Sequence, residues 1–99
     1  MIQGTTPTHK FSLPFEASCI KAVRIAYEQK GKILLTKELR DCKPEQNGLT
    51  TQLTQEETLK FDANVNVRVQ LHVLTNNDEA LASKPISVPV YVLLDKRVI

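Results

Sequence analysis

The stretch VNVRVQLHVLT, residues 65–75, alternates aliphatic and polar side chains along its whole length. A period of two places one set on each face of a β-strand. The aliphatic set is Val65, Val67, Val69, Leu71 and Val73. We therefore predict a strand over residues 65–75 that has one buried face, with Val69 and Leu71 in the core, and one solvated face.

Short apolar segments separated by turn-forming residues lie on both sides of this strand. They predict further strands over residues 9–13, 19–29, 32–39, 49–53 and 80–92. Val23, Ile25 and Tyr27 in the second of these strands, and Ile33 and Leu35 in the third, are expected to pack against the buried face of 65–75. Residues 43–48 (KPEQNG) read as a loop because of their composition.

One segment, residues 54–59, has a helical signature. Thr54 and Glu57 have the spacing of a capping box, in which each side chain satisfies a free backbone N–H of the first turn. The segment is too short to be a stable helix alone, so a single turn is predicted. Leu59 and Phe61 are expected to close one end of the core.

Two prolines, Pro85 and Pro89, lie in the last predicted strand. Because proline has no backbone N–H, strands that contain it are found at sheet edges. We therefore expect residues 80–92 to form an edge strand. Its apolar face would consist of Ile86, Val88, Val90 and Val92.

These elements predict an all-β fold: an immunoglobulin-like sandwich of two antiparallel sheets with six to seven strands, forming a single domain over residues 1–99. The buried tryptophan and paired cysteines of antibody domains are absent. A small closed barrel is the alternative. No alternation of strands and helices points to a parallel sheet.

Composition narrows the classes of function. The net charge is +2 and no long run of like charges occurs, so neither nucleic acid nor a membrane is an expected partner. The N-terminus does not read as a signal peptide, and we expect synthesis and retention in the cytosol. Cys19 and Cys42 lack metal-ligand spacing and are expected to be free thiols, Cys19 as a small buried hydrophobe.

Reactive groups are few, and we expect no enzyme activity, cofactor or metal site. His72 belongs to the solvated face of its strand, and no nucleophile motif accompanies it. Asp62 and Asp78 could hold calcium only at one end of the sandwich, without the ligand spacing of a calcium loop. Tyr27 has the pattern of an inward residue and Tyr91 that of an outward one.

The basic residues and the carboxylates are interpreted as ordinary surface groups. Those considered are Arg24, Lys37, Arg68, Lys84, Glu56, Glu57 and Glu79. Spread over several strands and turns, they form no groove for single-stranded nucleic acid.

The C-terminal VYVLLDKRVI contains more aliphatic side chains than one sandwich core can take. Leu93 and Leu94 are adjacent, so an extended chain points them to opposite sides. Val98 and Ile99 follow, and Tyr91 precedes them. We predict a partner contact formed by Tyr91, Leu93, Leu94, Val98 and Ile99, with the alternative that the tail folds back along a sheet edge.

Four pieces of the chain, GTTPTH (4–9), LPF (13–15), LTQEET (53–58) and ALAS (80–83), carry a family resemblance. Together with their surroundings they resemble small uncharacterised proteins of Firmicutes prophages, which tend to occur among structural and assembly genes. The layout is also similar to the immunoglobulin-like N-terminal domain of phage baseplate upper proteins, as architecture only. The resemblance transfers no catalytic residue.

What the resemblance implies is a non-enzymatic virion structural or assembly protein, associated with the tail or baseplate, that acts through protein–protein contacts. Its expected partners are other virion or assembly proteins, or a second copy of the chain. The expected location is the host cytoplasm at synthesis and the virion after assembly. The alternatives are a carbohydrate- or host-surface-binding module of the particle, and a small enzyme or enzyme regulator.

Overall fold

The computed structural model describes all residues 1–99. In chain order the strands and the helix are β1 (Thr8–Ser12), β2 (Ile20–Gln29), β3 (Lys32–Glu38), β4 (Lys43–Glu45), β5 (Gly48–Gln52), α1 (Gln55–Thr58), β6 (Val67–Thr75), β7 (Ala80–Ala82) and β8 (Ile86–Val88). Two 3₁₀ turns, Ala17–Cys19 and Leu39–Asp41, connect strands. None of the helices is long and apolar enough to cross a membrane.

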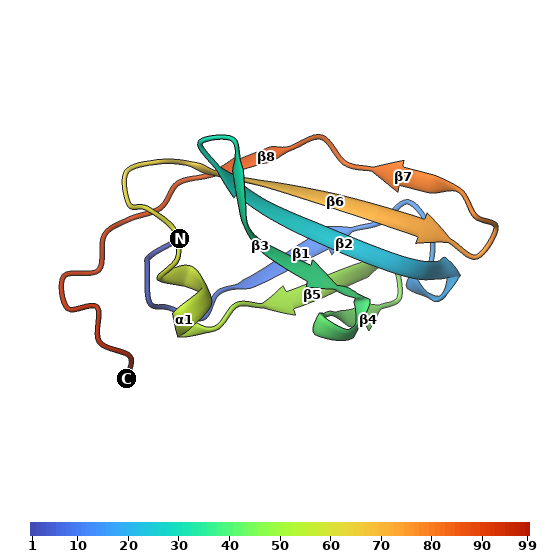
Figure 1. Cartoon of the computed structure of the whole chain (residues 1–99). Helices are drawn as coiled ribbons and strands as arrows, with labels where there is room; N and C mark the ends of the chain where they lie inside the picture. The colour runs from blue at the N-terminus through green and yellow to red at the C-terminus, as the bar shows by residue number, and fades with distance from the viewer.

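Two antiparallel sheets face each other as separate layers (Figure 1). The smaller has the order β1-β5-β4. The larger has the order β3-β2-β6, followed by β7 and β8, which both pair with β6. These orders correspond to strands B-E-D and C′-C-F-G of an immunoglobulin sandwich. The predicted immunoglobulin-like fold is therefore confirmed, and the closed barrel is excluded because no strand pairing joins the two sheets.

The alternation that defines β6 gives the face predicted from the sequence. Val67, Val69, Leu71 and Val73 are buried, and the polar residues between them are exposed. They belong to a core of 15 buried hydrophobic residues drawn from both sheets. The strand begins at Val67, two residues later than expected, because the preceding Asn64 has a left-handed φ of 65° and turns the chain.

The structure corrects one part of the predicted core: Ile33 was expected to be buried, but the residue is 59% exposed. The cause is a β-bulge: Tyr27 pairs with Leu35, but the next residue, Glu28, pairs with Ile33. The extra residue on β3, Leu34, moves everything before it to the opposite face of the sheet. Leu35 remains buried as predicted, whereas Ile33 joins Glu28 on the outer face.

The prediction of a loop over residues 43–48 is wrong for the first half of that segment. Lys43–Glu45 forms β4, which pairs with β5 in a tight hairpin closed at Gln46 and Asn47. All three residues of β4 are exposed, so the segment has none of the apolar alternation by which sequence patterns reveal strands. Backbone pairing with β5 alone defines it.

The predicted edge strand over residues 80–92 is divided in two. β7 and β8 each pair only with β6, as the prolines indicate, but Lys84 and Pro85 interrupt the pairing after Ser83, whose N–H still donates to the Leu71 carbonyl. Only Val90 of the expected apolar face is fully buried. Ile86 is exposed although it pairs with Val69, and Val92 is exposed because the chain beyond Val88 leaves the sheet toward the N-terminal segment.

The capping box at the start of α1 is confirmed. The Thr54 hydroxyl accepts from the Glu57 N–H at 3.2 Å, and the Glu57 carboxylate accepts from the Thr54 N–H at 2.8 Å. Phe61 is buried after the helix, as expected, and Leu59 is half-buried.

Thr54→Ala should lower the free energy of unfolding by about 1 kcal/mol, because it removes the side-chain acceptor of the cap. Urea denaturation of the variant beside the wild type measures this difference. Gln52→Ala, a substitution at an exposed position two residues earlier, is the control. It should leave the free energy of unfolding within about 0.5 kcal/mol of the wild-type value. Equal midpoints for Thr54→Ala and wild type would contradict a stabilising cap.

Candidate partner-binding surface at the C-terminus

The first and last segments of the chain lie side by side at one end of the sandwich, next to α1 (Figure 1). Ile2 and Tyr91 form a parallel bridge. In this bridge the Gln3 N–H donates to the Tyr91 carbonyl at 3.1 Å, and the Tyr91 N–H donates to the Met1 carbonyl at 2.8 Å. The predicted alternative, a tail folded along the sheet edge, is not found, because this bridge is isolated and belongs to neither sheet.

Gln3 fixes the chain after this bridge. Its side chain is 4% exposed, and its Nε2 donates to the Phe61 carbonyl at 2.6 Å. Its Oε1 accepts from the Leu93 N–H at 3.2 Å and from the Lys96 ammonium at 2.8 Å. One buried amide thus connects the core, the N-terminal segment and the tail. Nothing in the local sequence marks Gln3 for this position.

Gly4 allows the tail to lie close to the N-terminal segment. Its φ is +72°, a left-handed conformation that residues with a side chain rarely adopt, and an added Cβ would clash with the Leu93 side chain. Leu93 is accordingly half-buried against this glycine. Of the predicted contact residues, Leu93 is therefore the one that faces the molecule.

Two hydrogen bonds fix the far end of the tail to α1. The Gln55 side chain donates to the Ile99 carbonyl at 3.1 Å and accepts from the Ile99 N–H at 2.9 Å. An open hollow of about 480 Å³ lies between the tail and the start of α1, and Val98 lines it. The tail therefore has a defined path although it belongs to no strand.

Five apolar side chains along this path are exposed, and we call them the C-terminal apolar surface. They are Tyr91, Val92, Leu94, Val98 and Ile99. Leu94 is 94% exposed and Tyr91 is 57% exposed. The opposite orientations predicted for Leu93 and Leu94 are found, and Val92 is an addition that the sequence had placed in the core. The sequence signal for this surface is the number of aliphatic residues that follow one another closely after Val90.

A second group of polar side chains lies between the sheets. Tyr27 is fully buried, and its hydroxyl is 2.7 Å from His9 Nδ1. Burial raises the pKa of the Tyr27 phenol and lowers that of the His9 imidazole. Tyr27 also contacts Phe61, with ring centroids 5.9 Å apart. Tyr27 lies on the strand that carries the buried tryptophan in antibody domains.

Lys37 is buried, which corrects its assignment to the solvated surface. Its ammonium is 2.7 Å from a Glu57 carboxylate oxygen. Burial acts to raise the pKa of Glu57, but the hydrogen bonds from Lys37 and from the Thr54 N–H together hold it below its ordinary value. Since every buried polar side-chain atom has a hydrogen-bond partner, the geometry of these groups is that of a satisfied core.

The remaining candidates from the sequence lie apart from one another. Asp62 pairs with Lys30 and Asp78 pairs with Lys21, and no group of three or more potential metal ligands is present. Cys19 is exposed, not buried as expected, because it is the last residue of the 3₁₀ turn Ala17–Cys19 and lies before β2 begins at Ile20. Cys42 is half-buried, and both thiols are free.

Among the comparisons with known proteins, the search of solved structures finds a match, and the match concerns the fold. The immunoglobulin-like domain of mouse leukocyte-associated immunoglobulin-like receptor 1, solved as a strand-swapped dimer, superimposes with a TM-score of 0.54 and 15% sequence identity. The match covers 94% of this chain and 84% of that one. No protein-family model and no curated protein matches the chain. At this identity the likeness shows an immunoglobulin-like fold alone.

Proposed function

We propose that the chain is a non-enzymatic structural or assembly protein of a phage or prophage particle, associated with the tail or baseplate, which acts through protein–protein contacts. The observation that carries the proposal is the C-terminal apolar surface: five aliphatic or aromatic side chains between residues 91 and 99 are each exposed. Exposed apolar groups that are clustered in this way mark interaction sites. The phage assignment is supported by the sequence resemblance.

The energetics favour this surface as a contact. Each aliphatic side chain removed from water contributes about 1.5–3 kcal/mol before the costs of association. Ordering a flexible segment is among those costs. Here the hydrogen bonds from Gln3 and Gln55 already hold the tail, so less entropy remains to be lost on binding.

The partner in this proposal is another virion or assembly protein. A second copy of the chain is the other partner that we consider. The receptor domain that shares the fold was solved as a strand-swapped dimer. In this chain the edge formed by β7 and β8 is held by two short pairings with β6, and it leads directly into the tail. Light scattering at high micromolar concentration distinguishes a dimer from a chain that waits for a different partner.

The experiment that tests the proposal is quantification of the chain in purified particles. Particles are released from the lysogen that carries the gene, banded on a density gradient and analysed by mass spectrometry. We expect the chain to be present at a fixed ratio to the tail proteins. Its absence from both particles and assembly intermediates would overturn the proposal.

A carbohydrate- or host-surface-binding module remains the alternative function, and Tyr91 is the observation in its favour. Sugar-binding surfaces use exposed aromatic rings, and Tyr91 provides one beside the tail, whereas Tyr27 is buried. The same particles would then contain the chain, but removal of the Tyr91 ring would reduce host adsorption and leave assembly intact.

A further inference from the structure

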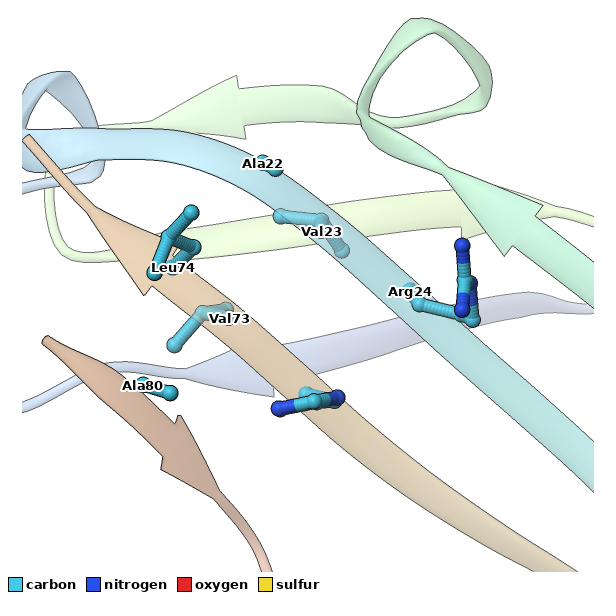
Figure 2. Close-up of a pocket in the computed structure, with 7 residues that line it drawn as sticks. Ala22, Val23, Arg24, Val73, Leu74 and Ala80 are labelled. Atoms are coloured by element: carbon cyan, nitrogen blue, oxygen red, sulfur yellow. The ribbon is translucent and has the colours of Figure 1, made fainter. Parts of the chain in front are cut away.

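The outer face of the larger sheet carries a hollow of about 230 Å³ between β2, β6 and β7 (Figure 2). Apolar residues make up most of its lining: Ala22, Val23, Val73, Leu74 and Ala80. The two polar residues that line it are Arg24 and His72. The hollow lies at the opposite end of the sheet from the C-terminal apolar surface.

Arg24 differs from the other arginines of the chain in having no carboxylate partner. Arg40, Arg68 and Arg97 each form an ion pair with an acidic side chain. Glu38, which is opposite Arg24 in the β2–β3 register, is bonded to Arg40 instead. The Arg24 guanidinium therefore has no acidic partner within the chain, and Figure 2 shows its nitrogen atoms on the side of β2 away from Leu74 and Ala80.

His72 is the direct cross-strand neighbour of Arg24 on β6. The other histidine, His9, is bonded to Tyr27, whereas the His72 ring has no hydrogen-bonded partner. The hollow is thus lined by an arginine and a histidine that are neighbours across two strands, and neither side chain has a hydrogen-bonded partner within the chain. A planar guanidinium pairs with a carboxylate through two parallel hydrogen bonds.

From this arrangement we propose that the hollow binds the carboxylate of an acidic residue on a partner protein, with a neighbouring aliphatic side chain of that partner lying on Ala22, Leu74 and Ala80. Charge complementarity selects the carboxylate, and the alanine and leucine side chains select the aliphatic group. Size favours a protein side chain, because pockets that enclose whole small molecules measure about 300–1,000 Å³. This contact does not depend on the phage assignment or on the C-terminal apolar surface.

A peptide titration of the isotope-labelled full chain, followed by NMR, tests the proposal. The probes are acetyl-Leu-Glu-Leu-amide and its glutamine counterpart, acetyl-Leu-Gln-Leu-amide. We expect saturable shifts at Ala22, Arg24 and Leu74, with the glutamine peptide binding about fivefold more weakly, a difference of about 1 kcal/mol. Arg24→Gln should abolish this preference. Arg97→Gln, which removes an exposed arginine in the tail, should leave it unchanged.

Three outcomes would overturn the proposal. The first is equal affinity of the two peptides, which would mean that the hollow does not distinguish a carboxylate from a neutral amide. The second is a preference that survives in Arg24→Gln, and the third is an absence of localised shifts in the millimolar range. Because Arg24 is exposed, its replacement should not affect folding, and a thermal melt of each variant verifies this.

Discussion

Leu71→Ala should lower the free energy of unfolding by about 2–5 kcal/mol, a large part of the stability of a domain this small. Leu71 lies in the middle of β6, is buried, and pairs with Ile25 on β2. Its truncation removes apolar contacts and leaves a cavity between the two sheets. Thermal denaturation followed by circular dichroism measures the effect, for which we expect a fall of roughly 10 °C or more in Tm.

The adjacent residue provides the matched control for this substitution. His72 is on the same strand but on the solvated face, so His72→Ala should change the free energy of unfolding by less than about 0.5 kcal/mol. If Leu71→Ala and His72→Ala melted at the same temperature, the assignment of the buried face of β6 would be wrong.

Glu57→Ala should lower the free energy of unfolding by about 3 kcal/mol, because it leaves the buried Lys37 ammonium without its partner. The Lys37 side chain is 9% exposed, so water can replace the carboxylate only poorly. The substitution also removes the acceptor for the Thr54 N–H. Glu56→Ala, at the exposed neighbouring position, is the control and should be close to neutral.

A double variant separates the two causes. Lys37→Met with Glu57→Ala removes the unpaired charge and should recover part of the loss, leaving mainly the capping contribution.

The difference in the free energy of unfolding between wild type and Glu57→Ala should also depend on pH. Since the folded protein lowers the pKa of Glu57, this stabilisation is complete above the ordinary value of 4.5 and disappears as pH falls through the folded pKa. A difference that stayed constant down to low pH would contradict the ion pair.

Local patterns were sufficient for much of the fold. The alternation of β6 and the Thr54–Glu57 spacing are properties of neighbouring residues, and both elements form as those patterns predict. The two prolines correctly indicate a one-sided edge. What failed depends on contacts distant in sequence: the bulge that exposes Ile33 is a property of the β2–β3 pairing, which a single strand does not encode.

The candidate surface shows the same division. The excess of aliphatic residues after Val90 was readable, and so were the opposite orientations of Leu93 and Leu94. The anchors that fix the path of the tail, Gln3 and Gln55, lie 90 and 44 residues away from their tail partners. A lone polar residue in an irregular segment carries no signal of such a contact.

The measurement that tests the central claim most directly is incorporation of Leu94→Glu into particles assembled in the lysogen. Leu94 is almost fully exposed, so the charge should leave folding intact while it opposes burial of the C-terminal apolar surface in a partner. Ile33→Glu, at an exposed aliphatic residue of the outer sheet face, is the matched control. We expect a loss of more than about tenfold in particle-bound Leu94→Glu, with Ile33→Glu close to wild type. Equal incorporation of Leu94→Glu and wild type would contradict it.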